Sequence, residues 1–393
     1  MGFLFKTTKK EKLIAVFDIG SASVGGAMVK IPLDGKSIPI VLKSVRTNIK
    51  VHKDFDLDDF TRNMIKALNS TANALYYKKV GAPDEVVCVL ASPWYISQTR
   101  NIKMSQDKPF TFSKRLANDL INKEISSFSE VFKNKYESLK TSPEIIEQQI
   151  MSISLNGYTL DTPIGMKCKT LDINMVISLS PLSCTSKIKE TLSSIYHHIP
   201  VSFSSFTMAT YLAVRDKYIS PNSYLLIDIS GEITDVGIVN RGSLQSVLSF
   251  PFGKSTFFRY IYTKLEIELR DAEELFRLYN DDHLSPEFRK KVEPLFKSIQ
   301  KSWVEAFKKC VSTLPRNLVL PSTILLTADN DIKKWFVEVL QNEEYIQSIV
   351  SDHKCSVVTL DGQEFLNMCS VGEGGCDPFL MIEAIAIMRK NNK

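Results

Sequence analysis

Apolar and small residues follow the same order at two places in the chain. Residues 13–17 form a short apolar run, glycines punctuate the next ten residues, and residues 27–31 form a second apolar run. Short apolar runs separated by glycine-containing turns predict strands, so we expect a β-hairpin over residues 13–31. Residues 224–244 repeat this arrangement about 210 positions later. A long internal repeat predicts two similar halves.

Each predicted hairpin carries an aspartate where its first strand ends. The residues that follow are mostly small: Gly20, Ser21, Ala22 and Ser23 after Asp18, and Ser230, Gly231 and Thr234 after Asp228. A turn with little side-chain bulk lets backbone N–H groups approach an anion, while a carboxylate holds a hydrated cation. One such hairpin alone is more often only a tight turn. Two facing hairpins predict a cleft that grips the phosphates of a nucleotide with magnesium.

A long segment interrupts the first half. Residues 96–172 separate a predicted strand at 85–92 from another at 171–180. The segment contains its own helical stretch at 113–135 and an apolar strand at 145–155. This is too much structure for a loop, so the pattern predicts an inserted subdomain.

A helix is expected in the second half over residues 285–311. Ser285 and Pro286 form a cap and first-turn pair, and apolar residues then recur at spacings of three and four. We interpret this apolar stripe as part of the core, with a groove for a partner as the alternative.

Composition narrows the class of protein. The 393 residues carry a net charge of only +5, which argues against a dedicated nucleic-acid binder. No apolar run reaches the roughly 18 to 20 residues that a membrane span needs. The seven cysteines are scattered without a C-x-x-C pair, as in a reducing compartment. We therefore expect a cytoplasmic protein that does not bind nucleic acid.

The motifs and their order resemble those of the actin and sugar kinase superfamily, and within it the branch of the division protein FtsA and the type IV pilus protein PilM. Asp18, Gly20 and Ser21 match the first phosphate motif of that family. Its second phosphate motif is matched by Asp228, Gly231, Thr234 and Asp235. Segments such as ASPWY at 91–95 and PFGKSTF at 251–257 are also similar, so the resemblance covers most of residues 12–385.

The resemblance implies an α/β, two-lobed actin-like (ribonuclease H-like) fold with an FtsA-type inserted subdomain in the first lobe. Each lobe is expected to contain a five-stranded mixed sheet flanked by helices. The expected parts are a basic N-terminal tail at 1–11, the first lobe core at 12–95 and 173–218, the inserted FtsA/PilM-type subdomain at 96–172, the second lobe core at 219–260 and 318–390, and a helical subdomain of the second lobe at 261–317.

The function implied by the resemblance is an assembly platform that recruits membrane proteins of a cell-division or type IV pilus machine. ATP and magnesium are the implied cofactors, with Asp18 and Asp228 holding the metal through water and the two turns holding phosphates. Binding would act as a conformational and polymerisation switch, with at most weak ATPase activity. Implied partners are the cytoplasmic tail of a membrane protein, a division or pilus component, and further copies of the chain in filaments. These partners would bring the chain to the inner face of the membrane.

Two departures from the family pattern keep alternatives open. Where the second phosphate motif has three glycines, this chain has Ser230, Gly231 and Glu232, and a carboxylate there must turn away from phosphates or repel them. The glycines of the family's adenosine motif are replaced by residues 328–331, ADND. One alternative is a nucleotide-free pseudo-ATPase scaffold. The other is a small-molecule kinase with Asp235 or Glu232 as the catalytic base.

Overall fold

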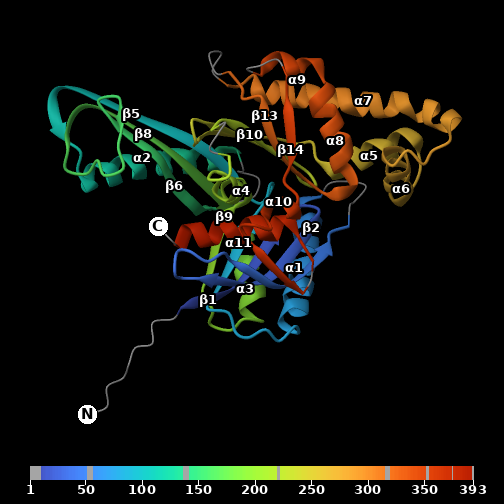
Figure 1. Cartoon of the computed structure of the whole chain (residues 1–393), viewed down its shortest axis with the longest axis horizontal. Helices are drawn as coiled ribbons and strands as arrows, with labels where there is room; N and C mark the ends of the chain where they lie inside the picture. The colour runs from blue at the N-terminus through green and yellow to red at the C-terminus, as the bar shows by residue number, and fades with distance from the viewer. Residues whose placement is uncertain are drawn as a thin grey trace, which may run out of the picture.

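The computed structural model describes residues 10–50, 56–135, 141–218, 222–314, 319–350, 354–373 and 375–391. These residues form two lobes and a third part that projects from them (Figure 1). Most of the predicted basic tail at 1–11 lies outside the described residues.

The first lobe is built on a six-stranded mixed sheet in the order β15-β3-β2-β1-β4-β9. Its strands are β1 (Glu11–Ile19), β2 (Ser23–Pro32), β3 (Ile40–Asn48), β4 (Glu85–Leu90), β9 (Val201–Ser205) and β15 (Ser370–Glu373). β1 and β2 pair antiparallel as the predicted hairpin, and β1 pairs parallel with β4. Every residue of β1 from Ile14 to Ile19 is buried, because helices cover both faces of the sheet.

Four helices cover the two faces of this sheet. Side chains of α1 (Leu57–Tyr76) and α3 (Leu182–Ser193) share a core with Phe17 on one face. Side chains of α4 (Phe206–Val214) and α11 (Pro378–Asn391) share another core with Val16 on the opposite face.

The second lobe contains the predicted five-stranded sheet, in the order β12-β11-β10-β13-β14. Its strands are β10 (Tyr224–Ile229), β11 (Thr234–Asn240), β12 (Ser243–Phe250), β13 (Thr323–Ala328) and β14 (Ser356–Thr359). The helices of this half are α5 (Lys254–Leu265), α6 (Leu269–Asn280), α7 (Pro286–Val311), α8 (Asn330–Asn342), α9 (Glu344–Ile349) and α10 (Gly362–Phe365). β10 and β11 form the second predicted hairpin.

The predicted helix of the second half is α7, and its apolar stripe belongs to the core. Ser285 caps it by accepting a hydrogen bond from the backbone N–H of Phe288, and Pro286 is its first residue. Phe296 and Trp303 on the stripe are fully buried among the side chains of the second lobe. This stripe therefore leaves no groove for a partner.

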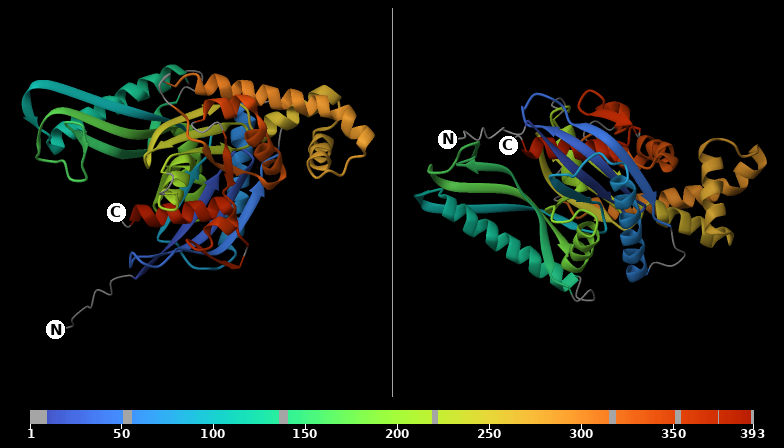
Figure 2. Two further views of the ribbon diagram at one scale, coloured as in Figure 1. Left: turned by 45° about the horizontal axis from the view of Figure 1, so that its top comes forward. Right: turned by 90° about the horizontal axis from the view of Figure 1, so that it is seen from below.

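The projecting part is a four-stranded antiparallel sheet with one long helix (Figure 2). It contains β5 (Ile96–Thr111), β6 (Pro143–Leu155), β7 (Tyr158–Thr159), β8 (Lys167–Pro181) and α2 (Lys114–Lys135). Phe128 and Phe132 of α2 are buried in a separate core between helix and sheet. We call this part the insert.

Three features differ from the expectations. β8 pairs with β5 and β6 along its length, so residues 173–181 belong to the insert's sheet and not to that of the first lobe. β15 adds a sixth strand to the first lobe, and α11 packs on that lobe's sheet, although 318–390 was expected in the second lobe. Apolar periodicity shows that a segment is buried but not which sheet covers it. β15 is also only four residues long, too short to give a pattern.

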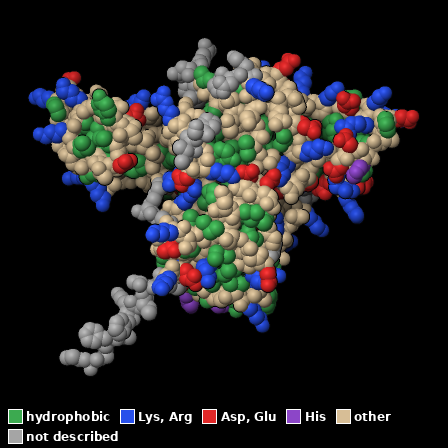
Figure 3. All heavy atoms as spheres, in the orientation of Figure 1, with side chains coloured by type: hydrophobic (Ala, Val, Ile, Leu, Met, Phe, Trp, Pro, Cys, Tyr) green, Lys and Arg blue, Asp and Glu red, His purple; other side chains and the backbone are tan. Residues whose placement is uncertain are grey.

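The described residues contain no helix that is both long enough and apolar enough to cross a bilayer. In the view of Figure 3, acidic and basic side chains are mixed over both lobes, while Lys and Arg side chains gather on the far end of the insert.

Candidate functional site

The two hairpins meet between the lobes and share one backbone geometry. The N–H of Gly20 and that of Ser230 each bond to the carbonyl oxygen three residues further on, both at 3.1 Å. Asp18 and Asp228 both occupy the last position but one of the first strand. The repeat in the sequence is therefore a repeat of local structure.

The turns of the two hairpins touch each other. The Oγ atoms of Ser21 and Ser230 lie 3.1 Å apart, and the backbone N–H of Glu232 donates to Ser21 Oγ at 3.0 Å. A Cβ atom on Gly231 would lie 2.7 Å from the backbone nitrogen of Ala22. Only glycine permits this approach of two backbones.

The space left between the hairpins is a cavity of about 30 Å³, which we call the hairpin cleft. Its lining includes eight of the nine residues predicted to hold a cofactor: Asp18, Gly20, Ser21, Ala22, Ser23, Asp228, Ser230 and Gly231. The ninth, Thr234, does not line the cleft. Its hydroxyl donates to the carbonyl oxygen of Phe252 at 2.6 Å inside the second lobe.

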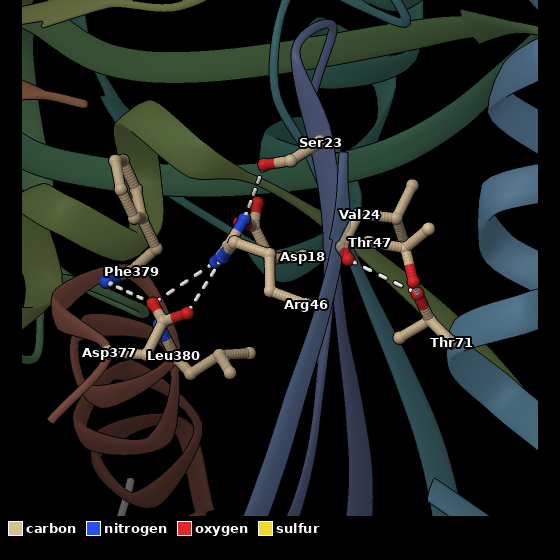
Figure 4. A network of polar contacts seen from close by, with 9 residues as sticks. All are labelled: Asp18, Ser23, Val24, Arg46, Thr47, Thr71, Asp377, Phe379 and Leu380. Atoms are coloured by element: carbon tan, nitrogen blue, oxygen red, sulfur yellow. Dashed lines mark hydrogen bonds and ion pairs between the residues drawn. The ribbon is translucent and has the colours of Figure 1, made fainter. Parts of the chain in front are cut away.

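Arg46 of β3 lines the hairpin cleft and forms ion pairs with Asp18 and Asp377 (Figure 4). Its Nη2 lies 2.8 Å from Oδ2 of Asp18, and its Nε donates to Oδ2 of Asp377 at 2.7 Å. Its Nη1 donates to the hydroxyl of Ser23 at 2.8 Å, and its guanidinium lies 5.1 Å from the ring centre of Phe379. The cation beside Asp18 in this structure is thus an arginine of the same chain.

Burial and charge act against each other at these groups. Burial raises the pKa of Asp18 to about 6, although the Arg46 guanidinium opposes that rise. The two carboxylates raise the pKa of Arg46 above its ordinary value despite its burial. The ion pair therefore compensates for the cost of burying Asp18 in the centre of the molecule.

The acidic groups of the second hairpin also have partners within the chain. Asp228 accepts a hydrogen bond from Thr327 at 2.6 Å, and burial raises its pKa well above the usual range. Asp235 accepts from Ser92 of the first lobe at 2.9 Å and from Ser249 of the second at 2.6 Å. Burial raises the pKa of Asp235 to about 6. Asp235 therefore links the two lobes. Its carboxylate is buried and hydrogen-bonded, so it is not available as a catalytic base.

The side chain of Glu232 points away from the hairpin cleft, as expected for a carboxylate within a phosphate motif. Both of its oxygens pair with the guanidinium of Arg259. The first two N–H groups of α5, those of Lys254 and Ser255, donate to the carbonyl oxygens of Ser230 and Gly231 at 2.9 and 2.6 Å. These helix N-terminal donors, which suit an anion, are occupied by the turn itself.

A nucleotide with magnesium does not fit the hairpin cleft in this arrangement. The cavity of about 30 Å³ is about a tenth of the smallest typical ligand pocket, since such pockets measure roughly 300–1,000 Å³. A hollow of about 300 Å³ opens beside it, lined by Asp329, Asn330 and residues 375–379, and Arg46 lines both spaces. No group of three or more metal-binding side chains occurs within the described part of the chain.

A second cavity, of about 230 Å³, lies where the first lobe meets the insert. It is lined by β4, β9, α4 and the last turns of α11, and we call it the β9 pocket. Glu147 of β6 accepts hydrogen bonds from Ser204 at 2.8 Å and from Lys390 at 2.5 Å, and both donors line the pocket. The insert is thereby attached to the rim of the pocket.

The sequence patterns did not predict Arg46, Asp377 or Glu383 as site residues. Arg46 looks like a polar position on a strand, because nothing local shows that it reaches Asp18. Glu383 does leave a signal, because it is the one charged residue of the run FLMIEAIAIM at 379–388. A lone charge in an apolar helix costs free energy and needs a reason.

The chain has the two-lobed fold of the actin-like ATPases. It is similar to a structure described as the PilM–PilN type IV pilus biogenesis complex, with a TM-score of 0.59 and 12% identity over 97% of this chain and 98% of that chain.

Two further solved structures have lower TM-scores. The ethanolamine utilization protein EutJ from Carboxydothermus hydrogenoformans gives a TM-score of 0.42 at 11% identity, over 97% of this chain and 90% of that chain. An ROK hexokinase from Thermus thermophilus gives 0.39 at 11% identity, over 95% of this chain and 97% of that chain. TM-scores this low support no argument about this chain. No protein-family model and no curated protein sequence matches the chain.

Proposed function

We propose that the chain is an actin-like assembly platform of the PilM kind, which binds a cytoplasmic segment of a membrane protein where the first lobe meets the insert. The fold likeness to a PilM–PilN complex over nearly the whole of both chains supports the class of protein. The observation that carries the proposal is the β9 pocket, because it lies beside the insert, whose Glu147 bonds to two residues of the pocket lining.

Several polar contacts join the insert to the first lobe around this pocket. Glu147 of the insert is buried and bonds to Ser204, Ser205 and Lys390 of the first lobe. Glu144, on the same strand, accepts a hydrogen bond from Lys189 of α3 at 2.7 Å. A site that is already in its bound shape loses less entropy when a peptide enters it.

The closed hairpin cleft supports a platform that works without nucleotide. Arg46 supplies the positive charge that magnesium would bring, and the two turns contact each other where phosphates would lie. A kinase would need an available carboxylate base, but Asp235 and Glu232 are both engaged within the chain. The pseudo-ATPase scaffold is thus favoured over the kinase. Whether the partner belongs to a division or a pilus machine is part of what the experiment decides.

The test uses synthetic peptides that copy the cytoplasmic tails of single-span membrane proteins encoded next to this chain's gene. Binding to the full chain is measured by fluorescence anisotropy. Ser202→Trp fills the β9 pocket from its half-buried rim, and we expect it to weaken binding by about tenfold or more. Ser105→Trp, at an exposed position of the insert, is the matched control. Equal binding by both variants and the unchanged chain would contradict the proposal.

A further inference from the structure

The far end of the insert carries most of the net charge of the chain. Residues 105–115 and 156–170 contain five basic and two acidic residues, which gives this end +3 of the total of +5. The basic residues are all exposed: Lys108, Lys114, Arg115, Lys167 and Lys169. Within the described residues none of the four lysines forms an ion pair, whereas Arg115 lies 3.9 Å from Asp119. This end, which we call the insert tip, therefore carries positive charge that the chain does not neutralise.

Backbone hydrogen bonds hold the two segments of the insert tip together. β5 and β8 pair as far as the tip, and beyond this pairing the N–H of Phe112 donates to the carbonyl oxygen of Met166 at 2.9 Å. The turn after β6 joins the same end, since the N–H of Asn156 donates to the carbonyl oxygen of Thr170 at 2.9 Å. The basic side chains of both segments therefore share one end of the sheet, where Figure 3 shows them gathered.

Three large apolar side chains are exposed among these charges (Figure 3). Tyr158 is 75% exposed, Ile164 53% and Met166 46%. The loop that carries Ile164 and Met166 is attached to the core of the insert, because the N–H of Gly165 donates to the carbonyl oxygen of buried Phe112 at 2.8 Å. A single exposed apolar residue is ordinary, but a group of them on a loop held in place indicates a surface that binds a partner.

This combination of groups matches the surface of an anionic membrane. Acidic lipid headgroups attract lysine side chains, and each lysine strengthens binding by about fivefold. Aliphatic side chains such as those of Ile164 and Met166 gain free energy at the boundary between headgroups and acyl chains, and a tyrosine ring suits the same depth. A nucleic acid matches less well, because arginine and stacked aromatic rings are the groups that suit its phosphates and bases.

We propose that the insert tip binds the surface of a membrane that contains anionic lipids, with its lysines at the headgroups and Tyr158, Ile164 and Met166 at the edge of the acyl region. The inference goes beyond the proposed function and does not rest on it, because the β9 pocket lies towards the other end of β6. Glu147 beside the pocket and Leu155 at the tip are separated by about 26 Å of strand. A cytoplasmic segment of about ten extended residues spans that distance.

The first experiment measures how the full chain sediments with vesicles. We expect it to bind vesicles that contain about 30% phosphatidylserine and not vesicles of phosphatidylcholine alone. Lys167→Gln with Lys169→Gln should weaken binding by about twentyfold, because two charges are lost. The matched control is Lys290→Gln with Lys291→Gln, which removes the same charge from exposed positions of α7 and should leave binding unchanged. No preference for the anionic vesicles, or equal losses in the two double variants, would overturn the inference.

A second experiment tests for contact with acyl chains, which a nucleic acid does not have. Cys376 is the one exposed cysteine of the seven, so Ile164→Cys combined with Cys376→Ser directs a fluorescent label to the insert tip. With phosphatidylserine vesicles we expect the emission to shift to the blue and to be quenched by lipids brominated in their acyl chains. The same label at Lys290→Cys should respond to neither. A label at Ile164→Cys that the brominated lipids do not quench would overturn the inference, and a response to a short DNA duplex instead would make the insert tip a nucleic-acid surface.

Discussion

The hairpin cleft and the β9 pocket differ in the space that their paired polar groups leave. In the cleft, each polar side chain of the lining has a partner in the same chain, and a cavity of only about 30 Å³ remains. In the pocket, Ser202 and Lys390 are also paired, with Glu85 and Glu147, but a cavity of about 230 Å³ remains. A sequence motif can therefore locate a site without showing whether the site has room for a ligand. A site whose paired groups leave no room holds the fold together, whereas a cavity that remains beside paired groups has room for a ligand.

The largest expected loss of stability comes from removing Arg46, the cation of the hairpin cleft. Arg46→Ala leaves the buried carboxylates of Asp18 and Asp377 without their shared partner. Breaking a buried ion pair in this way costs about 3 kcal/mol or more of unfolding free energy. Urea denaturation followed by circular dichroism measures it.

The matched control is Arg62→Ala, because Arg62 pairs with Asp59 on the surface of α1. That pair should contribute less than about 1 kcal/mol. Similar losses for the two arginine variants would show that the cleft pair is no more important than a surface pair.

A smaller loss of stability is expected from substitutions where the two hairpins touch. Gly231→Ala places a Cβ about 2.7 Å from the backbone of Ala22, so the turns must move apart at a cost of about 1–3 kcal/mol. Ser21→Ala removes only the hydroxyl contacts to Ser230 and Glu232 and should cost about 1 kcal/mol. Melting curves of the two variants compare these costs. An unchanged melting temperature in Gly231→Ala would mean that the hairpins are not in contact.

The pH dependence of stability tests the contacts that Asp235 makes with both lobes. The pKa of Asp235 is about 6 in the folded chain against an ordinary value of 3.8, so between these values the folded state binds more protons than the unfolded state. Its contribution to stability is therefore present at pH 4 and is lost as the pH rises through 6. One pKa unit corresponds to about 1.4 kcal/mol, so the shift amounts to about 3 kcal/mol at most, and Asp235→Asn should flatten the pH dependence by that amount or less. Denaturation at pH 4, 5, 6 and 7 tests it, and parallel curves for variant and unchanged chain would contradict it.

The sequence was sufficient for the two hairpins, for α7 and for the location of the cleft between the hairpins. The Asp–small-turn repeat correctly predicted both hairpins, and the cap at Ser285 correctly predicted the start of α7. The placement of α11 and the reach of Arg46 depend on contacts between residues hundreds of positions apart. Local periodicity carries no information on such contacts.

The measurement that tests the central claim most directly is a thermal melt of the full chain with and without about 5 mM Mg–ATP. A ligand present at 100 times its Kd would add about 2.7 kcal/mol of unfolding free energy. Because Arg46 pairs with Asp18 and the two turns touch each other in the hairpin cleft, we predict no change in the melting temperature. A rise of about 2 °C or more that disappears in Asp18→Ala would show that the cleft opens to bind nucleotide, and would contradict the account.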